Sequence, residues 1–162
     1  PEIDQMTITI TQSPIVPAGV DQSACANNAD VSLLGSVSNA GGGSWTGGSG
    51  TFNPSNTALN AVYTPTPAEI TTGSVTLILT STTNGLCNAE NDAMLISFTP
   101  APIVNAGADQ TICANNANIT LSGSVNGATG ASWTGGLGVF TPNNPTLNAV
   151  YSPTAAEIAS GN

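Results

Sequence analysis

The sequence contains no lysine, no arginine and no histidine among its 162 residues, and its nine acidic residues give a net charge of −9. Nucleic acids are excluded as partners, because Lys and Arg make the phosphate contacts that supply most of that affinity. No apolar run approaches the roughly 20 residues that a membrane helix requires. We therefore expect mature, exported, soluble material that inserts into no membrane.

The same absences remove the usual catalytic groups. No His or Lys is present to activate a Ser or Thr nucleophile, and no phosphate-binding loop with its lysine exists. Paired carboxylates are the one acid–base option that remains. We predict that the chain is not an enzyme and holds no cofactor.

Charged residues make up only 6% of the chain and apolar residues 40%, whereas disordered chains show the opposite balance. Short β-branched or alternating runs, separated by Gly, Asn and Pro clusters, are typical of strands. We expect strands near residues 13–19, 30–37, 43–47, 50–52, 59–65, 74–82 and 93–99. This spacing predicts an all-β sandwich of about seven strands.

The chain repeats itself with a period of 88 residues. The segment SWTGGSGTF begins at Ser44 and SWTGGLGVF at Ser132, and more than half of the residue pairs aligned at this shift are identical. The phase predicts the closing strand of a preceding repeat at residues 1–13, a complete repeat at 14–101, and a second repeat at 102–162 that is truncated before its last strands. We expect a window of a longer array, with neighbouring repeats as partners.

The core of each repeat is expected to hold its aromatic residues and the apolar strand residues. These are Trp45, Trp133, Tyr63, Tyr151, Phe52 and Phe140, with Leu33, Val37, Val62, Leu77, Leu79, Leu95 and Ile96. Neighbours on one strand cannot all face inward. A sugar-stacking role for the tryptophans is the alternative to burial.

The segment TPAEITTG predicts a short helical turn. Thr66 and Glu69 fit a capping box, Pro67 fits the first helical position and Gly73 the exit. Thr154 and Glu157 stand at the same offsets in the second repeat. These glutamates are therefore expected to be structural.

The segment PIVNAGADQTICANNANITLSGSV from Pro102, with LNAVYSPTAAEI further on, resembles the tandem PKD-like, immunoglobulin-like repeats of giant Bacteroidota cell-surface proteins. The gliding-motility adhesins of flavobacteria are the nearest type, and the resemblance covers the whole chain. It implies an immunoglobulin-like sandwich, export by type IX secretion, and a place in a long filament on the bacterial cell surface.

Cysteines fall in register with the repeat: Cys25 and Cys87 give one pair per repeat, and Cys113 repeats Cys25 with its partner outside the chain. An oxidising compartment fits this pattern. A bridge within a repeat, a bridge between adjacent repeats and free thiols all stay open. In an immunoglobulin-like sandwich Cys25 and Cys87 belong to opposite ends, which favours a bridge between repeats.

Acidic residues gather where repeats are expected to meet. Glu90, Asp92 and Asp109 are candidate calcium ligands, since calcium binds oxygen atoms. No dense DxDxD pattern exists, so we favour no metal site. Asp21 and Asp109 are expected instead to accept a backbone N–H in a turn.

These observations together predict a non-catalytic stalk or filament repeat of a large secreted adhesin, which gives length and mechanical strength in adhesion or gliding motility. Surface polysaccharide or substratum would be bound through other domains. Two alternatives are a carbohydrate-binding immunoglobulin-like module and a self-assembling extracellular sheath or fibre subunit.

Overall fold

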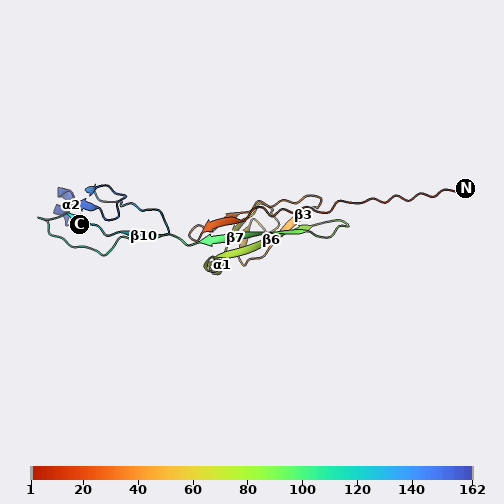
Figure 1. Cartoon of the computed structure of the whole chain (residues 1–162), viewed down its shortest axis with the longest axis horizontal. Helices are drawn as coiled ribbons and strands as arrows, with labels where there is room; N and C mark the ends of the chain where they lie inside the picture. The colour runs from red at the N-terminus through yellow and green to blue at the C-terminus, as the bar shows by residue number, and fades with distance from the viewer. Residues whose placement is uncertain (1, 162) are drawn as a thin grey trace. The chain divides into compact units, whose positions relative to one another are not determined.

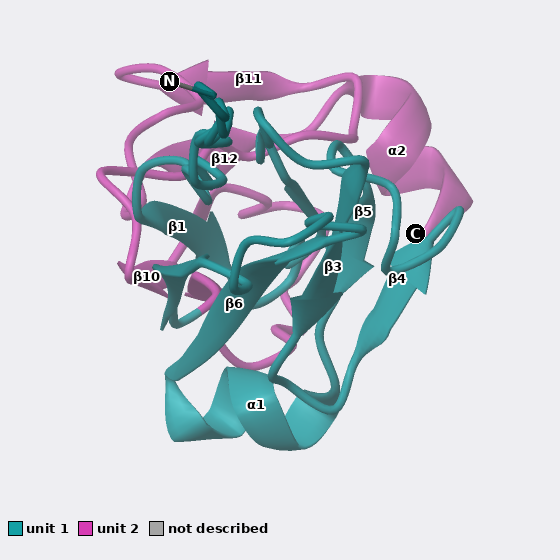
Figure 2. Ribbon diagram, turned by 90° about the vertical axis from the view of Figure 1, so that its right-hand side faces the viewer, with its two compact units in different colours: residues 1–100 teal, residues 101–162 magenta. Residues whose placement is uncertain are grey.

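The computed structural model describes residues 2–161; Pro1 and Asn162, at the outer ends of the first and third predicted segments, lie outside the described residues. The chain divides into two compact units, residues 1–100 (unit 1) and residues 101–162 (unit 2), coloured separately in Figure 2. Strands account for 34% of the chain and helices for 8%, which confirms the all-β class.

Unit 1 is a sandwich of two sheets. The first sheet has the order β1-β7-β6-β3, with β1 (Gln22–Cys25), β7 (Asn91–Thr99), β6 (Ser74–Thr82) and β3 (Gly42–Thr46). The second sheet has the order β2-β5-β4, with β2 (Val31–Ser32), β5 (Val62–Thr64) and β4 (Thr51–Asn53). Strand β1 pairs with β7 in parallel, and the other neighbours are antiparallel. Helix α1 (Pro67–Thr72) leads into β6 (Figure 1).

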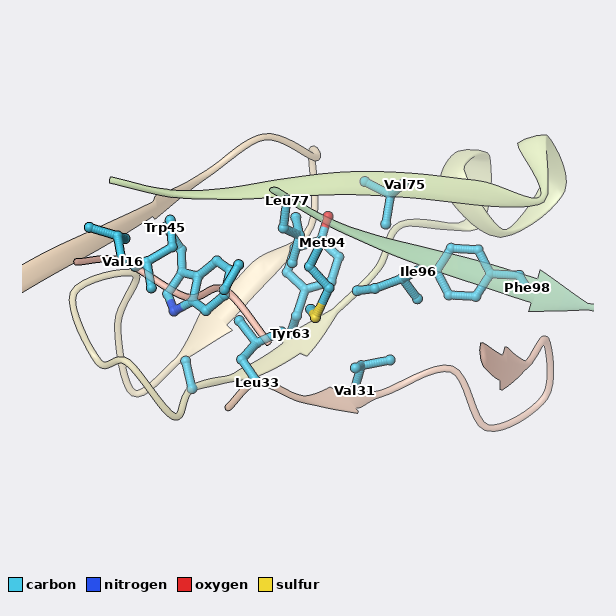
Figure 3. Packing of buried hydrophobic residues seen from close by; sticks show 13 residues of the cluster. Val16, Val31, Leu33, Trp45, Tyr63, Val75, Leu77, Met94, Ile96 and Phe98 are labelled. Carbon is cyan, nitrogen blue, oxygen red and sulfur yellow. The ribbon is translucent and has the colours of Figure 1, made fainter. Parts of the chain in front are cut away.

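The core of unit 1 lies between these sheets (Figure 3). Strand β6 alternates buried and exposed side chains along its whole length, as a half-buried strand must. The largest fully buried side chains are Trp45, Tyr63, Leu33, Leu77, Leu79, Met94 and Ile96. Facing strands thus contribute one continuous apolar layer.

The pleat corrects two core assignments. Leu95 is 38% exposed, because its neighbours Met94 and Ile96 occupy the inward positions of β7. Val62 is only half-buried, since the next residue, Tyr63, faces inward. Val37 is partly buried and packs against the core from outside the strands.

The expected strand at 13–19 is also corrected. It forms a single bridge between Ile15 and Ser38, because Pro14 and Pro17 have no N–H to donate to a ladder. Strand β1 forms instead at Gln22–Cys25, a segment without β-branched residues that pairs with β7. Residues 2–13 form no strand, and their side chains are exposed.

Unit 2 contains β8 (Ile103–Asn105), β9 (Ile119–Thr120), β10 (Ser124–Asn126), β11 (Val139–Thr141), β12 (Val150–Ser152) and α2 (Ala155–Ser160). Its sheet β11-β12-β9 repeats β4-β5-β2 of unit 1 in the same register, 88 positions later. Strands β8 and β10 pair where unit 1 has only the bridge at Ile15. Within residues 101–161 there is no counterpart of β6 or β7.

Candidate functional site

A network of hydrogen bonds, here called the Tyr–Glu cluster, joins β5, α1 and the loop between β3 and β4 in unit 1. Glu69 Oε1 accepts from the Tyr63 hydroxyl at 2.8 Å and from the Ser49 N–H at 2.7 Å. Glu69 Oε2 accepts from the N–H of Thr66 at 2.7 Å and from its hydroxyl at 2.9 Å. The Tyr63 hydroxyl accepts in turn from the Gly50 N–H at 3.0 Å. One carboxylate therefore holds three segments together.

Helix α1 begins within this cluster. Thr66 Oγ1 accepts from the Glu69 N–H at 3.3 Å, so the predicted capping box is present, and the helix ends at Gly73 with φ +89°. The capping role of Glu69 was expected from the sequence, but its bond to Tyr63 was not. A signal existed, because tyrosine and glutamate stand six positions apart in both repeats.

The glycine-rich loop leaves room for this network. Gly48 has φ +69°, and a Cβ at this position would collide with the Tyr63 hydroxyl. Gly136 of unit 2 has φ +71° and lies in the same way against the Tyr151 hydroxyl. The repeated SWTGG motif is thus explained by the close approach of backbone to a tyrosine.

Unit 2 contains the same cluster. Glu157 Oε1 accepts from the Tyr151 hydroxyl at 2.7 Å and from the Leu137 N–H at 2.8 Å, and Glu157 Oε2 accepts from the Thr154 N–H at 2.7 Å. Thr154 also caps α2, which ends at Gly161 with φ +71°. The network therefore forms independently in each unit.

The cluster fixes the protonation of its members. Burial and the hydrogen bond to Glu69 raise the pKa of Tyr63 to about 12. Burial alone would raise the pKa of Glu69, but the hydrogen bonds from Thr66, Ser49 and Tyr63 outweigh it and hold that pKa below its usual value. Hydrogen bonds from Leu137 and Tyr151 lower the pKa of Glu157 to about 2. A saturated carboxylate and a protonated phenol suit a structural joint rather than proton transfer near neutral pH.

Tryptophan in unit 1 is not available to a sugar. Trp45 is fully buried, and its Nε1–H donates to the Leu59 carbonyl at 3.2 Å. Phe52 packs against Tyr63 with ring centroids 4.9 Å apart, and Phe140 packs against Tyr151 at 4.8 Å. The flat aromatic faces of unit 1 are therefore occupied by other protein groups.

Unit 2 has an open groove of about 620 Å³. Its lining includes the half-buried Trp133, Phe140 and Tyr151, with Ile119 and Leu121. The counterparts of these residues in unit 1 pack against Leu77, Leu79, Met94 and Ile96 of the β6–β7 hairpin. The groove is therefore the place that corresponds to that hairpin.

The structure does not bring Cys25 and Cys87 together. Cys25 ends β1 and pairs with Thr99 at the end of β7, whereas Cys87 precedes the start of β7 at Asn91. The length of β7 separates them by roughly 25 Å, far beyond the Cα separation that a disulfide spans. Both thiols are free and half-buried, and Cys113 is free and exposed.

The candidate calcium ligands are also dispersed. Asp92 Oδ2 accepts from the Ala18 N–H at 2.9 Å, and Asp21 Oδ1 accepts from the Leu95 N–H at 2.9 Å. Asp21 thus accepts a backbone N–H, as expected, but from β7 rather than from a local turn. Glu90 and Asp109 do not join Asp92 in a group of acids, and none of the residues 2–161 forms a cluster suited to a metal ion.

The chain matches no protein-family model and no curated protein sequence. A solved structure described as "Protocadherin Gamma B2 extracellular cadherin domains 3-6" is 12% identical, with a TM-score of 0.41, and the match covers 87% of this chain and 39% of that one. Another, "Protocadherin gammaB7 EC3-6 cis-dimer structure", is 10% identical, with a TM-score of 0.39, and covers 88% and 40%. The chain spans about two-fifths of the length of each.

None of the helices among the described residues is both long enough and apolar enough to cross a membrane.

Proposed function

We propose that this chain is part of the non-catalytic stalk of a large secreted bacterial cell-surface adhesin, in which tandem immunoglobulin-like, PKD-like repeats provide length and mechanical strength for adhesion or gliding. The observation that carries the proposal is the recurrence of the Tyr–Glu cluster at the same offsets in both units. Its polar groups bind one another, so each repeat spends its conserved-looking motif on its own fold. That is the behaviour of a structural module.

The pairing of β1 with β7 supports a mechanical role. These strands lie near the two ends of the repeat and run parallel over four residue pairs, from Gln22 with Ile96 to Cys25 with Thr99. When the repeat is pulled by its ends, force runs along this ladder and loads its hydrogen bonds together. A ladder loaded in shear resists more than one that opens bond by bond.

Two carboxylates reinforce the same edge. Asp21 and Asp92 join the segment around β1 to β7 through the Leu95 and Ala18 N–H groups. Hydrogen bonds to a charged acceptor are stronger than neutral ones. The acids are therefore part of the load-bearing edge in this proposal, rather than ligands of a metal.

Single-molecule pulling of the native protein, under reducing conditions, tests the proposal. We expect a regular series of unfolding events, each releasing about 300 Å for 88 residues at about 3.5 Å per residue. Asp92→Ala should lower the unfolding force, whereas Asp30→Ala removes an exposed acid as a matched control. A native protein with no repeated event, or equal forces in both variants, contradicts the stalk.

A self-assembling fibre subunit is the second candidate, favoured by the open groove of unit 2. In that case a strand or hairpin from another copy would fill the groove. Sedimentation of the 162-residue chain across concentrations distinguishes the two: assembly that buries Trp133 supports the fibre, and a concentration-independent monomer supports the stalk. A carbohydrate-binding module would require glycan-array binding that the burial of Trp45 does not favour.

A further inference from the structure

Cys87 lies against the segment that precedes the complete repeat. Its Sγ is 3.3 Å from Thr11 Oγ1 and 3.3 Å from the Gln12 carbonyl oxygen, which it approaches as a donor. Both contacts belong to the loop between β6 and β7, at the beginning of β7. The thiol is half-buried there.

Cys25 lies at the other end of the sandwich, against the segment that follows β7. It pairs with Thr99, and its Sγ is 3.9 Å from the Pro100 carbonyl oxygen. This thiol is also half-buried. Each cysteine therefore marks one end of unit 1.

The repeat makes these two segments equivalent. Thr11 and Gln12 stand 88 positions before Thr99 and Pro100, so they end the preceding repeat in the way that Thr99 and Pro100 end this one. The same dipeptide position thus carries a Cys25-type sulfur from its own repeat and a Cys87-type sulfur from the next. Two sulfurs bound to one carbonyl oxygen at 3.9 Å and 3.3 Å are no further apart than the sum of those distances. Side-chain rotation brings such sulfurs to bonding distance.

We propose that Cys25 of each repeat forms a disulfide with the Cys87 counterpart of the repeat that follows. Cys87 then pairs with the Cys25 counterpart of the preceding repeat, and Cys113 pairs onward in the same way. The inference rests on the tandem array of the proposed function. It makes each joint between repeats a covalent cross-link in addition to the peptide chain.

The bond forms by ordinary thiol–disulfide exchange. One thiolate attacks a low-molecular-weight disulfide such as oxidised glutathione and releases one reduced thiol. The second protein thiolate then attacks the mixed disulfide and releases the other. Two protein thiols are oxidised, one external disulfide is reduced to two thiols, and the two protons leave to solvent or to the released thiolates.

The test extends the whole chain by a second copy of residues 75–101 after Asn162, which supplies unit 2 with its hairpin and with a copy of Cys87. The copy carries Leu86→Val as a mass label, because Leu86 is 97% exposed. The protein is refolded, dilute, in a glutathione redox buffer and digested unreduced with a protease that cleaves at acidic residues. Peptide mass spectrometry identifies the linked cysteines.

We expect Cys25 to be linked to the labelled cysteine in a monomer that has lost two hydrogens, with Cys87 and Cys113 free. A link from Cys25 to Cys87, a link from Cys113 to the labelled cysteine, or free thiols throughout overturns the proposal. The Cys25→Ser variant should keep the same folded spectrum and leave the labelled cysteine free. If the link forms but the native protein is short and not repetitive, the cross-link stands and the stalk fails.

Pulling the native array without reductant gives an independent readout. Cross-links between repeats limit the extension of each repeat to the 62 residues from Cys25 to Cys87, against 88 when the thiols are reduced. A bridge within each repeat would leave only 26. An oxidised increment of 88 or 26 residues contradicts the cross-link.

Discussion

Units 1 and 2 carry nearly the same sequence, yet a segment becomes a strand only where its partner is present. The trio β2, β5 and β4 reappears in unit 2 as β9, β12 and β11, because all three segments are there. The counterparts of β1 and β3, near residues 110–113 and 130–134, form no strands, since residues 101–161 contain no counterpart of β7 or β6. Strand formation here is decided by tertiary pairing rather than by local propensity.

Burial follows the same rule. Trp45 and Tyr63 are fully buried, whereas Trp133 and Tyr151 are half-buried around the groove. The Tyr–Glu cluster is unaffected, because its members lie within the shared segments. Local hydrogen bonds are thus set by the repeat motif, and core closure is set by the β6–β7 hairpin.

The largest expected effect comes from giving unit 2 that hairpin. In the chain extended by residues 75–101, we expect Trp133 to become buried, its fluorescence emission to move to shorter wavelength, and unit 2 to unfold cooperatively. A matched extension with Leu77→Asp and Leu79→Asp in the added copy should leave Trp133 half-exposed, because a carboxylate cannot be buried there unpaired. Equal spectra for the two extensions would contradict the equivalence of the units.

The two tryptophans should differ in what their removal costs. Trp45→Ala leaves a cavity in a closed core and should lower the free energy of unfolding of unit 1 by about 3–5 kcal/mol. Trp133→Ala should cost much less in the 162-residue chain, since its ring lines an open groove. Urea unfolding of each variant measures the difference. Similar losses at both positions would mean that unit 2 has a closed core in solution.

Much of the fold could be predicted from the sequence. The β6 boundaries, the capping boxes and the period of 88 rest on local or repeated patterns, and local patterns are visible in one sequence. Strand β1 could not be predicted, because Gln22–Cys25 is a strand only by virtue of its pairing with β7. Leu95 and Met94 were indistinguishable as core candidates until the register of β7 was known.

The joint at Glu69 was only half visible for a related reason. A capping box is a relation within four residues, so the sequence predicts it. The bonds from Tyr63 and Ser49 depend on how the glycine-rich loop turns against β5, which is a tertiary relation. Asp21 and Asp92 likewise reach β7 and Ala18, at 74 positions' separation, rather than a local turn.

Acid should weaken both units through the same carboxylate. Because the folded pKa of Glu69 is depressed, its contribution to stability is complete above the unfolded pKa of about 4.5 and is lost as pH falls through the folded value. For Glu157 the loss extends down to about pH 2. Thermal unfolding of unit 1 from pH 6 to pH 2 should show this decline. Glu69→Gln should flatten it, and an unchanged acid slope in that variant contradicts the assignment.

Alkali should act on the tyrosine of the same cluster. The folded pKa of Tyr63 is raised to about 12, so its contribution is complete below the unfolded value of 10.0 and is lost as pH rises through 12. Tyr63→Phe should remove this alkaline loss. It should also cost about 1–3 kcal/mol at neutral pH, because the Gly50 N–H loses its acceptor. A Tyr63→Phe variant that keeps the alkaline transition would assign it to another group.

The smallest expected effect tests whether the two helical turns are truly equivalent. Thr66→Ala removes the capping hydroxyl of α1 and should cost unit 1 about 1 kcal/mol. Thr154→Ala should have a comparable effect on α2, since the bond from the Glu157 N–H to the Thr154 hydroxyl is 3.3 Å, as at Thr66. Thr66→Ser and Thr154→Ser keep the acceptor and serve as controls. Because the capping box lies wholly within shared segments, closing the groove of unit 2 should leave the Thr154→Ala loss unchanged. A loss that grows with the added hairpin would show that α2 depends on the core after all.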